Sequence, residues 1–335
     1  MRTSNFDGCC DVNRPGAVGP TLAGAVAQAC DVAPLPRAAE PGLNRRQAGA
    51  VGRPPAPADF LASNRFPGVS RRRWLRQGAG ALLALGLGHG CARLPATARG
   101  GEFHFVVLND THYQSPQCGR WFDRVGASIR SHTPPPAFCL VAGDLSEHGT
   151  AAELGAMREA LDRFGLPVFT VIGNHDYAGP SDRRAYEQLF PERLNYHFEH
   201  AGWQFVGLDS TDGNKAQGTR IQPATLAWLD ATLPRLDPER PVVVLTHFPL
   251  GIFVPMRPAN AAAVLERLLT LNLVAVFSGH FHGFTERRAG RAALTTNKCC
   301  AISRANHDGT RAKGYFLCAA GRDGLRRQFV EVTPG

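Results

Sequence analysis

Residues 99–335 of this sequence predict an α/β fold built on mixed β-sheets. From Phe103 onward, short apolar runs rich in β-branched residues alternate with helical segments, as in βαβ units. Later in the chain, runs pair around short turns such as His200-Ala201-Gly202, which favours antiparallel strands. No linker divides this region, so we expect it to form one domain.

The predicted elements are justified by their composition and by their boundaries. Thr150 and Glu153 form a capping-box pattern that marks the start of one helix. We expect helices at 120–131, 150–164, 223–233 and 261–271. We expect strands at 103–108, 137–141, 168–172, 195–198, 203–208, 242–245, 274–277, 292–295, 315–318 and 328–332.

Five short polar motifs follow the predicted strands in a fixed order. They are Asp110-Thr111-His112, Gly143-Asp144, Gly173-Asn174-His175-Asp176, Thr246-His247 and Gly279-His280-Phe281-His282. Side chains two residues apart project to the same side of extended backbone, so each Asp-x-His or His-x-His pair could face one point. Seven side chains of metal-ligand type therefore stand at strand ends, where a sheet can bring them together.

The chemistry of these side chains predicts two metal ions. Mixed nitrogen and oxygen donors favour Mn, Fe or Zn over Mg or Ca. Two aspartates against two divalent cations leave a net positive centre, which attracts a phosphoryl group. Two metals at one site are typical of enzymes that hydrolyse phosphate esters.

The net charge of +9 lies mostly in the first 98 residues. That stretch has 12 Lys and Arg against 5 Asp and Glu, whereas residues 99–335 have 25 against 23. The charge of residues 99–335 is therefore nearly balanced and does not favour binding of nucleic acid, so we expect none to be bound. The nine cysteines show no Cys-x-x-Cys pair and predict no disulfide framework.

Residues 70–98 resemble a twin-arginine (Tat) signal peptide. Arg71 and Arg72 precede an apolar run at 78–87, and Ala96-Thr97-Ala98 fits a signal-peptidase site. The run is much shorter than the roughly 20 residues of a membrane span. We therefore expect passage through the Tat translocase, a periplasmic or extracellular location, and no stable membrane span. Lipid attachment at Cys91 is the disfavoured alternative, because His89 interrupts the lipobox pattern.

Residues 1–69 do not fit in front of a signal peptide. They are rich in Pro, Gly, Ala and Arg and lack sustained periodicity, which is typical of disordered segments. We interpret this stretch as an over-extended N-terminus, with the native start near Val69.

Together, the five motifs resemble the signature of the calcineurin-like metallophosphoesterase family, over about residues 103–283. The resemblance implies a four-layer αββα sandwich with a dinuclear metal site. It implies that Asp110, His112 and His282 bind one metal, that Asn174, His247 and His280 bind the other, and that Asp144 bridges both. It further implies attack by a metal-bound hydroxide, with His175 protonating the leaving oxygen and Asp176 orienting His175.

The motif around Asp144 narrows the branch of the family. Purple acid phosphatases carry a tyrosine three residues after the bridging aspartate, but Glu147 occupies that position here. The run Gly143–Gly149, followed by Gly173-Asn174-His175-Asp176, is similar to the class III cyclic-nucleotide phosphodiesterase group. We therefore favour phosphodiesters as substrates. A phosphomonoesterase and a non-catalytic scaffold on the same fold remain the alternatives.

Other polar residues are given weaker roles. His148 is a candidate for substrate contact because it follows Asp144 closely. Asn306-His307-Asp308 repeats the letters of the catalytic motif without a strand before it, so a turn is expected. A structural hydrogen-bonding role is expected for Asp209.

Overall fold

The computed structural model describes residues 101–334. The predicted segments at 1–69 and 70–98 lie outside the described residues. The helices are α2 (Pro116–Arg130), α3 (Ala151–Asp162), α4 (Arg184–Leu189), α5 (Pro223–Thr232) and α6 (Ala261–Leu268), with 3₁₀ turns η2 (Asn174–Asp176) and η3 (Leu233–Arg235). The strands are β1 (Phe103–Leu108), β2 (Cys139–Val141), β3 (Val168–Thr170), β4 (Tyr196–His200), β5 (Trp203–Leu208), β6 (Val242–Thr246), β7 (Leu273–Ser278), β8 (Thr285–Ala289), β9 (Ala292–Thr296), β10 (Gly314–Gly321) and β11 (Gly324–Glu331).

The strands form two mixed sheets, as predicted. One sheet has the order β11-β10-β1-β2-β3, and the other has the order β4-β5-β6-β7-β9-β8. In the first sheet β1, β2 and β3 are parallel, and in the second β5, β6, β7 and β9 are parallel. The carboxyl ends of parallel strands in one sheet meet at the same edge, which is where the polar motifs lie.

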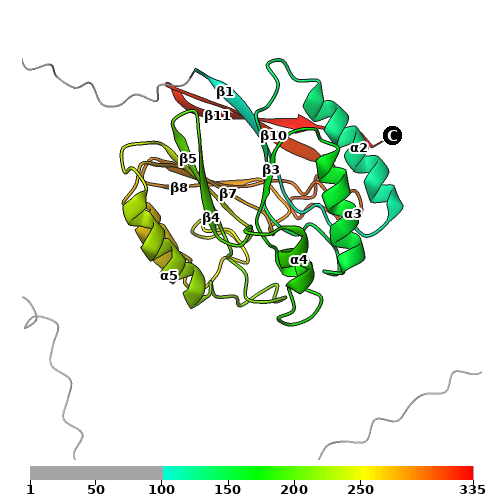
Figure 1. Ribbon diagram of the computed structural model, residues 1–335, viewed down its shortest axis with the longest axis horizontal. Coiled ribbons are helices and arrows are strands. Elements are labelled where there is room, and N and C mark those ends of the chain that lie inside the picture. The colour runs from blue at the N-terminus through cyan, green and yellow to red at the C-terminus, as the bar shows by residue number, and fades with distance from the viewer. Residues whose placement is uncertain (1–100, 335) are drawn as a thin grey trace, which may run out of the picture. The chain divides into compact units, whose positions relative to one another are not determined.

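Alternation along β1 shows how the layers are built. Val106 and Leu108 pack with residues of α2 and α3, whereas Phe105 and Val107 pack against the second sheet. Figure 1 shows α2 and α3 on one side of the strands and α5 on the other. The described residues therefore form the predicted αββα sandwich.

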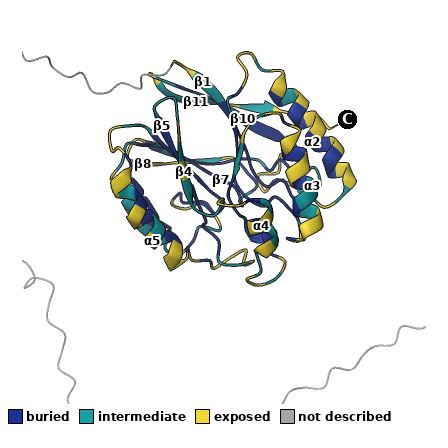
Figure 2. Cartoon of the chain, in the orientation of Figure 1, coloured by how far each residue is buried: buried dark blue, intermediate teal, exposed yellow. Residues whose placement is uncertain are grey.

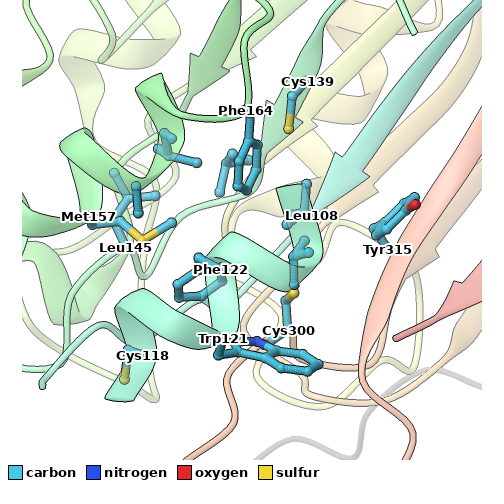
Figure 3. Packing of buried hydrophobic residues seen from close by; sticks show 14 of the residues in the cluster. Leu108, Cys118, Trp121, Phe122, Cys139, Leu145, Met157, Phe164, Cys300 and Tyr315 are labelled. Atoms are coloured by element: carbon cyan, nitrogen blue, oxygen red, sulfur yellow. The ribbon is translucent and has the colours of Figure 1, made fainter. Parts of the chain in front are cut away.

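Each helix layer covers its sheet with an apolar face. In Figure 2 the helices show buried residues toward the strands and exposed residues on the outer side. Figure 3 shows Trp121 and Phe122 of α2 beside Leu108 of β1, and all three are at most 2% exposed. None of the helices within residues 101–334 is long and apolar enough to span a bilayer. The five cysteines in this range are buried and unbonded.

Several boundaries differ from the prediction. Helix α2 begins at Pro116, because Ser115 has extended backbone and proline suits the first turn of a helix. The Thr150 side chain accepts a hydrogen bond from the Glu153 amide, so the predicted start of α3 is confirmed. Strand β8 was not predicted. It lies at a sheet edge and carries exposed arginines, so it lacks the apolar pattern of a buried strand. Charged side chains at an edge prevent pairing with the strands of other molecules.

The aromatic layer between the sheets should dominate the stability of the fold. The Phe138 ring lies 5.3 Å from that of Phe105 and 5.1 Å from that of Phe205, centroid to centroid. We expect Phe138→Ala to lower the free energy of unfolding by about 3–5 kcal/mol in chemical denaturation, since it leaves a cavity. Phe253→Ala, at a side chain that is 90% exposed, is the matched control and should change stability by less than about 0.5 kcal/mol. Equal effects would contradict the inter-sheet core.

Candidate metal centre

The sandwich brings the five motifs to one place. Asp110 and His112 follow β1, Asp144 follows β2, and Asn174 lies in the 3₁₀ turn after β3. In the second sheet, His247 directly follows β6, and His280 and His282 follow β7. These seven residues are at most 7% exposed, although they come from opposite sheets.

The backbone at the strand ends is not extended, contrary to the assumption behind the predicted pairs. Asp110, His112, Asp144 and His280 have φ angles of 51°, 42°, 51° and 63°. Non-glycine residues seldom adopt this left-handed region, and each such residue costs about 1–3 kcal/mol. The side chains therefore converge because sharp turns aim them inward, and this strain is concentrated at the candidate site.

Two groups of metal-ligand atoms share the carboxylate of Asp144. One group contains Asp110, His112, Asp144 and His282, and the other contains Asp144, His247 and His280. The donor atoms of each group lie within 4.8 Å of one another. The Asn174 Oδ1 atom lies 3.1 Å from His247 Nε2, which brings it to the second group.

The hydrogen bonds of the histidines test whether a cation fits. His247 Nδ1 lies 2.9 Å from the carbonyl oxygen of Ala142, and His280 Nε2 lies 2.8 Å from that of Ala216. A carbonyl only accepts, so these two nitrogens carry the protons. The remaining nitrogens, His247 Nε2 and His280 Nδ1, are 3.2 Å apart and present lone pairs to each other. A cation between them relieves this repulsion, so the donor set fits a metal ion.

The distances within the first group lead to the same result. His282 Nε2 lies 3.3 Å from His112 Nε2 and 3.4 Å from Asp110 Oδ1. Two ligands on one ion, each about 2.1 Å from it, stand roughly 3 to 3.5 Å apart. The residues therefore have the spacing that ligation requires.

Burial and neighbouring charges set the protonation of the donors. Burial lowers the pKa of His280 to about 4, and His247 contributes, which leaves a neutral imidazole. Burial alone would raise the pKa of Asp110, but His282 and the other imidazoles outweigh it and hold that pKa below its ordinary value. The same pair acts on His282, where Asp110 overcomes burial and raises the pKa to about 11. Metal binding must displace this proton.

His175 lies beside the first group, and Glu147 holds it there. The His175 Nδ1 atom donates to the Glu147 carbonyl oxygen at 2.8 Å. The Glu147 carboxylate lies 3.7 Å from the same nitrogen and 3.1 Å from His112 Nδ1. The candidate acid and a candidate ligand are thus oriented by one residue.

The predicted contact between Asp176 and His175 is wrong. Asp176 Oδ1 accepts from the backbone amide and hydroxyl of Ser146, at 2.9 and 3.1 Å, and Oδ2 accepts from the Gly173 amide at 2.9 Å. A 3₁₀ turn has three residues per turn, so neighbouring side chains point about 120° apart. Asp176 therefore joins the turn to the loop after β2. Burial, with the charge of Asp144, raises its pKa to about 8.

Glu147 and Arg304 also shape the candidate site, and neither was predicted to do so from the sequence. Glu147 served there only to exclude one branch of the family. Arg304 Nε donates to Glu147 Oε2 at 2.9 Å, and a second nitrogen contacts Oε1. Burial alone would raise the pKa of Glu147, but hydrogen bonds from His112 and Arg304 lower it to about 2. The position of Glu147, three residues after Asp144, was a usable signal; Arg304 had none.

The side chains of His148, Asp209 and Asp308 each form a hydrogen bond within the protein. His148 is bonded to Glu153 at the start of α3 and has a side chain that is 65% exposed. Asp209 accepts hydrogen bonds from Thr211 and Arg183, so the predicted structural role is confirmed. Asp308 forms a turn with Thr310, and the His307 ring stacks on His282 with centroids 5.1 Å apart.

The chain is also similar to known proteins. The sequence profile of the calcineurin-like phosphoesterases matches residues 103–284. The chain is similar to a probable cyclic nucleotide phosphodiesterase of Synechococcus, 27% identical over 154 residues, which are 44% of this chain and 58% of the relative. It is also similar to a probable glycerophosphodiester phosphodiesterase of Arcobacter nitrofigilis, 26% identical over 46% of this chain and 59% of the relative. The match thus spans about three fifths of the length of these curated relatives.

A solved structure shares the fold. A dimetal phosphatase from Danio rerio superimposes with a TM-score of 0.52 and 16% identity, covering 67% of this chain and 98% of the other. At this identity the likeness concerns the fold alone.

A matched pair of glycine variants tests whether the turns hold the candidate ligands. A Cβ atom on Gly173 would lie 2.2 Å from both the backbone nitrogen and Oδ1 of Asp144, whereas one on Gly179 would meet nothing within 4 Å. We expect Gly173→Ala to displace the shared carboxylate and to lower metal content, measured by atomic emission after dialysis, at least about tenfold. Gly179→Ala should keep the metal content of the unaltered protein. Full metal content in Gly173→Ala would count against a bridging Asp144.

Proposed function

Because this chain belongs to the calcineurin-like phosphoesterase family, we propose that it is a metal-dependent hydrolase of phosphate esters. The observation that supports this proposal most directly is the pair of buried donor groups that share Asp144. Asp110, His112 and His282 would hold one cation, and Asn174, His247 and His280 the other. Two cations at these positions would stabilise the charge that develops on the phosphoryl oxygens.

His175 is proposed as the acid that protonates the leaving oxygen. Its Nδ1 atom is held by the Glu147 carbonyl, so Nε2 is left for the substrate. The side chain is 29% exposed, unlike the buried donors, and its ring centroid lies 4.8 Å from that of His112. The Glu147 carboxylate lies 3.7 Å from His175 Nδ1, and hydrogen bonds from His112 and Arg304 keep it ionised.

Phosphodiesters are the proposed preferred substrates. The two curated relatives are named as probable diesterases, one for cyclic nucleotides and one for glycerophosphodiesters. Glu147 in place of a tyrosine argues against the purple acid phosphatase branch. A phosphomonoesterase and a non-catalytic scaffold are the competing proposals. The scaffold is disfavoured because His175 lies beside an intact donor set.

We also propose that the chain is exported through the Tat translocase and acts on a small-molecule ester outside the cytoplasm. This rests on Arg71, Arg72 and the small residues at 96–98. No role with nucleic acid is proposed, because the charge of residues 99–335 is nearly balanced.

Hydrolysis of bis(p-nitrophenyl) phosphate is the first test. We expect the Mn²⁺-loaded protein to release p-nitrophenolate, and a chelator to abolish the release, because the proposed charge stabilisation requires the cations. Re-addition of Mn²⁺ should restore turnover. A protein that contains metal but hydrolyses neither this diester nor p-nitrophenyl phosphate would favour the scaffold.

The role of His175 is tested by varying the leaving group. We expect His175→Ala to keep its metal but to lose about 10²–10⁴-fold in kcat for alkyl esters, and much less for p-nitrophenyl esters, since a good leaving group needs no acid. His197→Ala, at an exposed histidine on the edge strand β4, is the matched control and should keep full activity. If both classes of ester lose activity equally, His175 is not the acid.

A further inference from the structure

A cavity that none of the candidate metal ligands lines lies beside β10 and β11. It has a volume of about 720 Å³, within the range of small-molecule sites. Its walls come from β10 and β11 of one sheet and from segments next to β8 and β9 of the other. None of the residues that line it belongs to the two donor groups, so the proposed hydrolysis leaves this cavity without a role.

Three phenyl rings give the cavity aromatic walls. The centroid of the Phe316 ring lies 6.2 Å from that of Phe284 and 6.2 Å from that of Phe329, both at steep angles. Phe284 is 49% exposed, which is unusual for a large apolar side chain in a folded protein. Rings at such angles offer both faces and edges to a planar partner.

Lys298 supplies a positive charge to the wall of the cavity. Its Nζ atom lies 4.6 Å from the centroid of the Phe329 ring, and no carboxylate of residues 101–334 forms an ion pair with it. The Asp308 carboxylate in the same wall accepts hydrogen bonds from Thr310 and from the Phe284 amide, and the charge of Lys298 also acts on it without a direct ion pair. Arg327, over the ring of Phe316, is paired with Glu286. Lys298 is therefore the cation most available to a ligand.

Asn297 adds an unused polar group to the same wall. Its side chain is 3% exposed, and its Nδ2 atom has no hydrogen-bond partner among the described residues. The Oδ1 atom is occupied by the Lys298 amide at 2.9 Å. A buried donor without a partner costs about 1–3 kcal/mol, so Asn297 is a costly feature of this wall.

We propose that this cavity binds a planar aromatic ligand that carries an anionic group. The ring would lie among Phe284, Phe316 and Phe329, and the anion would be bound by Lys298. This binding does not depend on the proposed hydrolysis, and its test is a binding measurement.

Naphthalene-2-sulfonate is a suitable probe, because it joins an aromatic ring to an anion and cannot be hydrolysed as a phosphate ester. Titration calorimetry on the full chain should give a dissociation constant of about 0.1 mM, as expected for a ligand of this size. The affinity should be the same with bound Mn²⁺ and after chelation, since the metal centre is not involved. Naphthalene-2-methanol, which lacks the charge, should bind about tenfold more weakly.

Two variants and their matched controls locate the binding. Phe284→Ala should weaken binding of the sulfonate about tenfold, whereas Leu269→Ala, at another exposed apolar residue, should leave it unchanged. Lys298→Gln should remove the preference for the charged probe, and Lys215→Gln should preserve it. No saturable binding, binding that disappears on chelation, or equal affinity in Phe284→Ala and Leu269→Ala would each overturn the proposal.

Discussion

The candidate site depends on the buried carboxylate of Asp144, which belongs to both donor groups. Its Oδ1 atom accepts a hydrogen bond from the His175 amide at 2.9 Å and lies 3.3 Å from His247 Nε2, so a single residue joins the two sheets and the turn with the candidate acid. A buried anion of this kind is costly unless cations or donors surround it. The neighbouring imidazoles supply that environment and, although burial opposes them, hold the pKa of Asp144 below its ordinary value.

The rest of the fold keeps that arrangement rigid. The aromatic residues between the sheets hold the two strand edges in register, and the left-handed residues after β1, β2 and β7 turn side chains inward. Such strained backbone persists only where the surrounding packing determines it. The energy stored in these turns is thus offset by the sandwich core, which explains why polar ligands can stand at the ends of strongly apolar strands.

Local patterns in the sequence predicted mixed sheets with the seven candidate ligands at strand ends, whereas the four layers were implied by the family resemblance. Each motif follows an apolar strand, and parallel strands bring their carboxyl ends together. The features that could not be predicted from the sequence depend on the direction of a side chain or on contacts between distant residues. Asp176 is adjacent to His175 in sequence but points elsewhere in the 3₁₀ turn. Glu147 and Arg304 are 157 residues apart, and nothing local links them.

The segment that carries Arg304 also contributes to the wall of the cavity, and it packs around a buried lysine. Lys313 Nζ donates to the Arg304 carbonyl oxygen at 2.6 Å and contacts Cys299 Sγ at 2.8 Å. Burying an ammonium group without such partners would be prohibitive, so the segment must fold around it. One face of the segment then presents Arg304 to Glu147, while Asn297 and Lys298 line the cavity. Residues 297–304 therefore contribute Asn297 and Lys298 to the cavity wall, and Arg304 to the ion pair that holds Glu147 beside the candidate ligands.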